Sequence, residues 1–334
     1  MTENTHRDGL VGIGDLSRST GVPVRTLRFY CDEGILESRR SSGGHRLFDP
    51  ATAVDRVLLL RRLRALGLGL PAIVDVLAGR TSITDAVAAE RAALDTELGV
   101  LAWRRASLRA VEDAAPTQHA ARLEWLAAVQ DRRHAQDRLI AFWRRLLAPL
   151  PTAIFDGFVA MNLPHLPTDP PPEHLVAYAE LVARVTDPAL SVAMAGQLWR
   201  TDPRGIRDKC ALVTAVAEVC ETVDPLVAAH RRPGPGPELD RFIEAHATAR
   251  GERDTPRLRR RLLDNATDNH HGIHRYWTLT TEITGATTSG AAQFWLYRAL
   301  LRWADDCAGD EDRSRADPRG SARTSPTRRK VPEQ

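Results

Sequence analysis

Residues 21–30 read Gly-Val-Pro-Val-Arg-Thr-Leu-Arg-Phe-Tyr, and this stretch decides the fold of the N-terminal part of the chain. Gly21 predicts a tight turn after a short helix at residues 13–20, because glycine adopts a positive φ without steric cost. Pro23 stands near the first turn of a second helix, where its missing N–H does no harm, and Gly34 ends that helix. Two short helices joined by a tight turn predict a helix-turn-helix.

Residues 35–48 change character and predict a small β-hairpin. Polar residues 37–42 are followed by Gly43-Gly44, which turns the chain into His45-Arg46-Leu47-Phe48. This is the only convincing strand pair in the sequence. A capping aspartate and a proline, Asp49-Pro50, then begin a further helix. A hairpin directly after a helix-turn-helix predicts a winged helix-turn-helix DNA-binding domain, which we place at residues 10–80.

A long helix is expected next, because no proline occurs from Ile83 to Glu112. Apolar residues recur in it at intervals of seven, with a partial second row. The seam residues are Val87, Leu94, Leu98, Leu101 and Leu108. A seven-residue repeat favours a helix that pairs along a seam, the alternative being an ordinary amphipathic helix within its own domain. We therefore expect a dimerisation helix at residues 83–113.

The sequence after Pro116 predicts helices separated by proline-rich breaks. The expected helices cover residues 118–148, 153–162, 173–186, 189–199, 205–223, 238–249, 257–266, 272–284 and 290–305. The chain is thus expected to be mainly α, with an all-helical domain at 117–305. Residues 306–334 are charged and lack large apolar side chains, which predicts a disordered tail.

The bulk composition limits the classes of protein that fit. The chain has 334 residues, of which 43% are apolar, so two or three packed domains are possible. The formal charge is only +3, so any signal for nucleic-acid binding is local. The four cysteines form no CxxC pair, which argues against a disulfide framework or a zinc ribbon. Neither a signal peptide nor a membrane span is recognisable, so we expect a cytoplasmic, nucleoid-associated protein without a membrane partner.

Several stretches of residues 13–73 resemble the MerR family of bacterial regulators. They are Ile13-Gly14-Asp15-Leu16-Ser17, residues 21–30, Gly34-Ile35-Leu36, residues 42–48 and residues 66–73. Their order and spacing are kept over about 70 residues. The resemblance implies a homodimer joined by an antiparallel coiled coil. It also implies binding to an inverted repeat in promoter DNA, whose bending and untwisting realigns the promoter for RNA polymerase. Such distortion costs several kcal/mol.

The expected DNA contacts lie on the second helix, on the hairpin and on the helix after it. They are Val24, Arg25, Thr26, Arg28, Tyr30, Gly44, His45, Arg46, Arg61 and Arg62. Arg25 is the best candidate for reading a base edge in the major groove. The resemblance makes Arg28, Tyr30 and Arg46 phosphate contacts and gives Thr26 a supporting role. Tyr30 as a packing residue at the edge of the core stays open.

The chain departs from the family pattern at its cysteines. Cys31 stands where the family usually has an acidic residue, and it is either a redox-sensitive thiol or an inert, partly buried one. No cysteine lies between residues 32 and 209, so the cysteine sites of the metal-sensing and iron–sulfur members are missing. We therefore expect neither a cofactor nor a metal.

The C-terminal region offers only weak signals. The segment 274–279 and Phe294-Trp295-Leu296 resemble the helical tail of uncharacterised actinobacterial MerR-like regulators, which adds no known ligand. Aromatic residues either line a pocket for a small molecule or form plain core. The candidates are Trp143, Trp199, Tyr276, Trp277 and Trp295. His270 and His274 share a helix face and are metal ligands or, more simply, a solvated helix end.

Three functions remain possible on the sequence. The first is a dimeric transcription regulator whose helical domain binds a small molecule or a partner. The second is an architectural or partner-recruiting DNA-binding protein without a ligand. The third is an enzyme fused to a DNA-binding module, for which no catalytic residues or motif are found, so we expect no enzyme.

Overall fold

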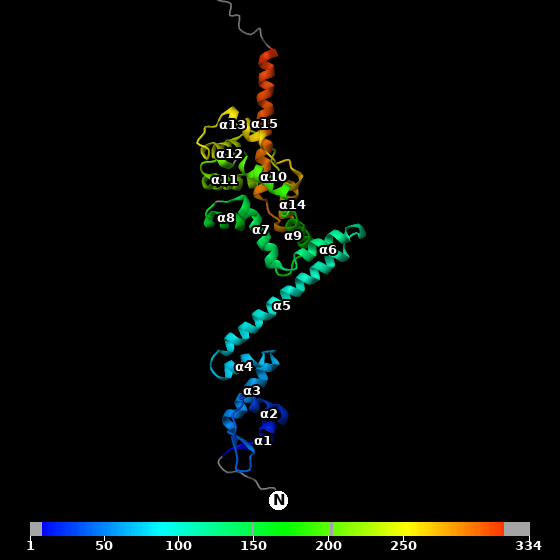
Figure 1. The fold of residues 1–334 in the computed structure, drawn as a ribbon, viewed down its shortest axis with the longest axis vertical. Coiled ribbons are helices and arrows are strands. Elements are labelled where there is room, and N and C mark those ends of the chain that lie inside the picture. The colour runs from blue at the N-terminus through cyan, green and yellow to red at the C-terminus, as the bar shows by residue number, and fades with distance from the viewer. Residues whose placement is uncertain (1–8, 149, 201–202, 317–334) are drawn as a thin grey trace, which may run out of the picture. The chain divides into compact units, whose positions relative to one another are not determined.

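The computed structural model describes residues 9–148, 150–200 and 203–316 (Figure 1). These residues divide into two compact units, one ending at Leu101 and the other beginning at Ala102. The boundary falls inside a single long helix, α5 (Ile83–Glu112). The fold is mainly α, as the sequence predicts, with a winged helix-turn-helix at its N-terminal end and helices throughout the second unit.

The helix-turn-helix of the first unit consists of α1 (Ile13–Thr20) and α2 (Val24–Asp32). Gly21 between them has φ +69°, and its N–H donates to the carbonyl of Ser17 at 2.9 Å. This confirms the tight turn expected at that glycine. Two further helices follow, α3 (Pro50–Ala65) and α4 (Leu70–Leu77). Asp49 caps α3 by accepting a 3.0 Å hydrogen bond from the N–H of Ala51.

The wing is part of a three-stranded antiparallel sheet in the order β1-β3-β2. The expected hairpin is confirmed as β2 (Arg39–Arg40) and β3 (Arg46–Phe48). A third strand, β1 (Val11–Gly12), pairs with β3 in the register Val11 opposite Phe48. The expectation of a single strand pair was wrong here, because two residues are too short for a period of two to be read.

The first unit has two small cores. One surrounds Leu16 and Leu27, which are fully buried and pack α1 against α2. The other surrounds Leu60 and Ile73 and packs α3 against α4. Tyr30 packs against both clusters, which supports its interpretation as a packing residue. Helix α2 is therefore held by apolar contacts on its inner face and leaves its outer face exposed.

Every secondary-structure element among the described residues of the second unit is a helix (Figure 1). Its helices are α6 (His119–Ala128), α7 (Arg132–Leu146), α8 (Thr152–Asn162), α9 (Pro172–Arg184), α10 (Pro188–Trp199), α11 (Lys209–Ala228), α12 (Pro237–Thr248), α13 (Pro256–Asp264), α14 (His271–Thr284) and α15 (Ser289–Ala316). Helix α14 packs against α9, and α11 packs against α12 and α15. One core surrounds Trp143 and Tyr276, and a second surrounds Phe242 and Leu300.

Several helix boundaries differ from the sequence expectation. The single helix expected at 118–148 is broken, because Asp131 caps α7 by accepting a 2.9 Å hydrogen bond from the N–H of His134. Helix α11 begins after Asp208, which caps it, rather than at residue 205. It then continues past residue 223 with Pro225 inside it. Local capping by aspartate thus overrides a continuous pattern of apolar residues.

The expected disordered tail from residue 306 was wrong for its first part. Helix α15 continues to Ala316, and residues 317–334 lie outside the described part of the chain. A helix that is already nucleated by packing gains one hydrogen bond for each residue added, so it can extend beyond its last apolar contact. No proline occurs between Ser289 and Ala316 to stop it.

No helix in the described part of the chain combines the length and the apolar character needed to span a membrane.

Candidate nucleic-acid interface

Helix α2 presents an exposed basic face. Arg25 and Arg28 are exposed, and within the described residues no side chain or carbonyl holds either guanidinium. Val24 and Thr26 are half-buried beside them, which fits a supporting role for Thr26. Long cations without internal partners are suited to phosphate oxygens and guanine edges. The outer face of α2 can therefore enter a major groove.

The wing is tied to α2 through Arg46. Its Nη2 lies 2.5 Å from Oδ1 of Asp32, and its Nη1 donates to the carbonyl of Arg28 at 3.3 Å. The hydrogen bond to Asp32 raises the pKa of Arg46. At the tip, Gly44 has φ +78° and His45 is exposed. Arg46 thus has a structural partner that the sequence analysis missed, because Asp32 lies in another element.

The arginines of α3 differ in their surroundings. Arg61 donates from Nη1 to the carbonyl of Thr20 at 2.8 Å and so ties α3 to the end of α1. Arg62 is exposed, with no such partner among the described residues. Arg61 therefore links α3 to the helix-turn-helix through a hydrogen bond. The side chain of Arg62 is exposed and accessible to a ligand such as DNA.

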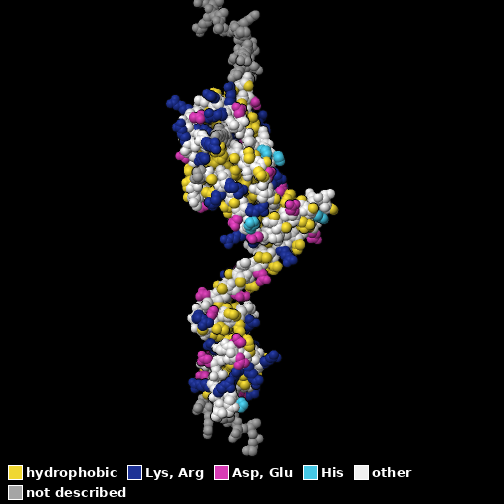
Figure 2. Space-filling view, viewed as in Figure 1, with side chains coloured by type: hydrophobic (Ala, Val, Ile, Leu, Met, Phe, Trp, Pro, Cys, Tyr) yellow, Lys and Arg dark blue, Asp and Glu magenta, His cyan; other side chains and the backbone are white. Residues whose placement is uncertain are grey.

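Two basic residues of the wing were missed by the sequence analysis. Arg39 and Arg40 form β2 and are both exposed. Arg40 lies opposite Arg46 in the hairpin and, with Arg28, lines a hollow between α2 and the wing. Basic side chains are prominent on the visible face of this unit, with acidic ones among them (Figure 2). The Arg-Arg pair just before the glycine turn was the signal that could have identified them.

Cys31 lies on α2 but is partly buried against the core. Burial raises the pKa of the Cys31 thiol, although Arg46 nearby opposes this. A thiol whose pKa is raised is a poor nucleophile. The geometry favours the inert interpretation of this cysteine.

Comparison with known families decides what this domain is. Residues 12–80 match the model described as MerR HTH family regulatory protein. Residues 12–80 form a MerR-type helix-turn-helix domain. The match begins within β1 and ends just after α4, so it covers the helix-turn-helix, the wing and the two helices that support them.

Curated relatives match a quarter of the chain or less. Nodulation protein NolA from Bradyrhizobium sp. (strain NC92) is 45% identical over 86 residues, which are 25% of this chain and 36% of the relative. Nodulation protein NolA from Bradyrhizobium elkanii is 43% identical over 86 residues, 25% of this chain and 39% of the relative. The HTH-type transcriptional regulator HmrR from Rhizobium leguminosarum bv. viciae is 35% identical over 60 residues, 18% of this chain and 46% of the relative. The chain thus spans less than half the length of these relatives, and no solved structure matches it.

Helix α5 follows the MerR-type domain and exposes a row of leucines. Leu94, Leu98, Leu101 and Leu108 are 48%, 62%, 53% and 64% exposed. Val87 instead packs against the core of the MerR-type domain. Four of the five expected seam residues are therefore about half or more exposed, and the fifth packs in the core of the MerR-type domain.

The aromatic candidates for a ligand site lie in or beside the cores of the second unit. The indole N–H of Trp143 donates to the hydroxyl of Tyr276 at 2.7 Å, and that of Trp277 donates to Oε1 of Gln197 at 3.1 Å. Trp199 is buried, and Trp295 donates to the carbonyl of Arg231 at 2.9 Å. Their packing and the hydrogen bonds of their N–H groups therefore explain these aromatic side chains as parts of the core.

The histidine candidates also have structural roles. His270 caps α14 by accepting a 3.2 Å hydrogen bond from the N–H of Gly272. His274 packs edge-on against Phe294, with ring centroids 4.5 Å apart. The described residues contain no group of three or more side chains that could hold a metal ion. His270 is therefore a capping residue and His274 a packing residue.

Proposed function

We propose that this protein is a dimeric, sequence-specific transcription regulator that binds promoter DNA through its MerR-type domain. The observation that carries the proposal is the exposed face of α2, where Arg25 and Arg28 have no partner among the described residues, in a domain that matches the MerR HTH model. The printed name of the relative HmrR, a transcriptional regulator, supports it. Such a regulator acts in the cytoplasm, where promoter DNA and RNA polymerase are found.

In this proposal, α2 enters the major groove and the wing contacts the backbone. Arg25 reads a base edge, while Arg28, Arg62 and the wing residues bind phosphates and fix the register. Arg40 adds a phosphate contact beside Gly44 and His45. The hollow lined by Arg28, Arg40 and Arg46 supports a path for one strand between α2 and the wing.

The dimer forms through α5, whose exposed leucines support an antiparallel pairing of two copies. A dimer binds an inverted repeat, because its two-fold axis relates two half-sites. Bending the promoter between the half-sites then changes its geometry for RNA polymerase. The second unit receives the signal that controls this distortion.

Arg25→Ala should remove base reading. We expect it to weaken binding to the preferred site by about 1–3 kcal/mol and to relax the sequence preference at one base pair of each half-site. The measurement is selection of sites from random DNA, followed by fluorescence anisotropy on the selected and the scrambled site. Arg80→Ala is the control, since Arg80 is exposed but pairs with Asp75 after α4. An unchanged preference in Arg25→Ala would show that α2 does not read the bases through this side chain.

Arg46→Ala should weaken binding to all DNA sites similarly and reduce the slope of log affinity against log salt by about one. Because Arg46 also pairs with Asp32, the variant Asp32→Ala separates its two roles. If Arg46 contacts phosphate, Asp32→Ala retains or strengthens DNA binding, since it removes a competing anion. If Arg46 only fastens the wing, both variants weaken DNA binding equally and the phosphate role is rejected.

A further inference from the structure

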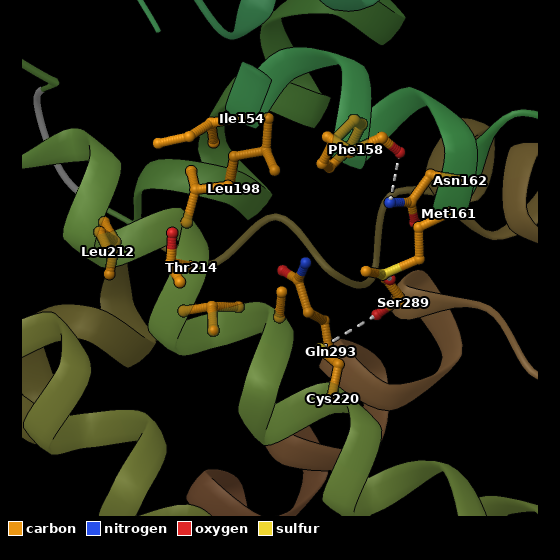
Figure 3. Close-up of a pocket in the computed structure, with 14 residues that line it drawn as sticks. Ile154, Phe158, Met161, Asn162, Leu198, Leu212, Thr214, Cys220, Ser289 and Gln293 are labelled. Carbon is orange, nitrogen blue, oxygen red and sulfur yellow. Dashed lines mark hydrogen bonds between the residues drawn. The ribbon is translucent and has the colours of Figure 1, made fainter. Parts of the chain in front are cut away.

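The second unit contains a cavity of about 210 Å³ between α8, α10, α11 and α15 (Figure 3). Its walls are mainly apolar. They include Ile154, Phe158, Met161, Leu198, Leu212 and Val216. An engineered apolar cavity of about 150 Å³ holds benzene, so this one has room for a substituted ring. The aromatic residues singled out from the sequence do not line it.

One amide side chain points into the middle of this cavity. Gln293 of α15 is 5% exposed and lines the cavity, and its amide faces the open space (Figure 3). Among the described residues this amide has no hydrogen-bond partner. Its amide atoms reach the open space of the cavity rather than being sealed in the core. Gln293 therefore offers an unused donor and an unused acceptor to whatever enters.

A second amide lies at the wall. Asn162 at the end of α8 is 3% exposed, and its Nδ2 donates to the carbonyl of Phe158 at 3.0 Å. Its Oδ1 is buried and has no hydrogen-bond partner. A cavity wall that carries two amide side chains differs from an ordinary packing defect, which is lined by apolar atoms alone.

The described residues that line the cavity include no charged side chain. Cys220 belongs to it, and burial raises the pKa of its thiol to about 12, so this group is neutral at physiological pH. A charged ligand would lose its hydration here without gaining an opposite charge, which is expensive. The chemistry of the wall therefore selects against ions.

We propose that this cavity binds an uncharged, mostly apolar molecule of about the size of a substituted ring, with a hydrogen-bond donor and acceptor side by side. A primary or cyclic amide has this pattern and pairs with the amide of Gln293. The proposal deepens the signal-sensing part of the proposed function and rests on it only for the link to DNA binding.

The test uses three probes on the full chain without DNA. They are benzamide, which is uncharged and has the donor–acceptor pair, ethylbenzene, which lacks it, and benzoate, which is charged. By calorimetry or ligand-observed NMR, we expect benzamide to bind with a Kd below about 1 mM and benzoate at least about tenfold more weakly. Absence of benzamide binding, or equal binding of benzoate, overturns the proposal.

Variants locate the site. Gln293→Leu keeps the volume and should weaken benzamide about tenfold, the loss expected for a hydrogen-bonded pair, while ethylbenzene changes less than about twofold. Ala217→Leu fills the cavity and should weaken both probes. Gln136→Leu is the matched control, because Gln136 bonds to Tyr178 outside the cavity and should leave both affinities unchanged. Equal benzamide affinity in wild type and Gln293→Leu overturns the role of Gln293.

Two further measurements keep the result interpretable. Gln293→Met is the second variant if Gln293→Leu does not fold, as judged by circular dichroism, and it makes the same prediction. DNA binding is measured separately on the same preparation without a probe. A preparation that binds DNA but not benzamide rejects only the cavity proposal. A preparation that binds benzamide but not DNA rejects only the proposed function as a DNA-binding regulator.

Discussion

Asp268→Ala should lower the free energy of unfolding of the second unit by about 3–5 kcal/mol, the range for removing one partner of a buried ion pair. Oδ2 of Asp268 accepts a 2.6 Å hydrogen bond from Nη1 of Arg200, and Oδ1 accepts one of 2.8 Å from Nη2. Oδ1 also accepts from Nε2 of Gln197 at 3.2 Å. Both charged side chains are 0% exposed. Removing the carboxylate leaves the Arg200 guanidinium buried without its counter-charge.

The measurement is urea unfolding followed by tryptophan fluorescence, which reports on this unit because all seven tryptophans lie at residues 103–303. Asp169→Ala is the matched control. It breaks an ion pair with Arg105 whose side chains are 58% and 60% exposed, so the expected loss is below about 1 kcal/mol. The double variant Arg200→Met/Asp268→Leu should recover much of the loss, because no charge is then left buried. A loss below about 1 kcal/mol for Asp268→Ala would contradict the account.

The double variant Leu98→Arg/Leu101→Arg should convert the proposed dimer into a monomer. In a paired α5 these side chains leave water, and each buried leucine contributes about 1.5–3 kcal/mol. Arginine in the seam would be buried without a counter-charge in both copies. The expected loss of affinity for an inverted repeat is about 10²–10⁴-fold, the range gained by linking two binding modules. Affinity for a single half-site should change little.

Sedimentation measures the oligomeric state, and fluorescence anisotropy measures binding to DNA with one or two half-sites. Val192→Arg is the control, because Val192 on α10 is 75% exposed and outside α5. It should leave both the mass and the affinity unchanged. A double variant that sediments as the wild type does would reject α5 as the dimer seam.

The helix-turn-helix could be predicted because its signals are local. Gly21 and Gly44 are needed where φ is +69° and +78°, and Asp49 caps α3 within two residues of itself. Such signals act between residues that are close in the chain, so they can be recognised in the sequence. Where a local cap competes with a longer apolar pattern, as at Asp131, the sequence analysis joined two helices that the structure separates.

Side-chain partners could not be predicted in the same way. Arg46 and Arg61 are predicted from the sequence as DNA contacts, but their bonds to Asp32 and to the carbonyl of Thr20 appear only in the structure. Gln293, proposed above as a ligand contact, could not be selected from the sequence, because nothing local distinguishes it from the other polar residues of α15. The aromatic candidates follow from the composition of this region, which contains no information about the shape of a cavity.

By itself, the sequence determined the helical class, the winged helix-turn-helix and the leucine row of α5, since each depends on residues a few positions apart. Only the tertiary structure decided which distant groups meet. Arg200 and Asp268 are 68 residues apart, and Trp143 and Tyr276 are 133 residues apart. The cavity around Gln293 likewise needs four helices at once. Burial and hydrogen bonding across such separations depend on how whole helices pack, and periodicity along one helix contains no information about its neighbour.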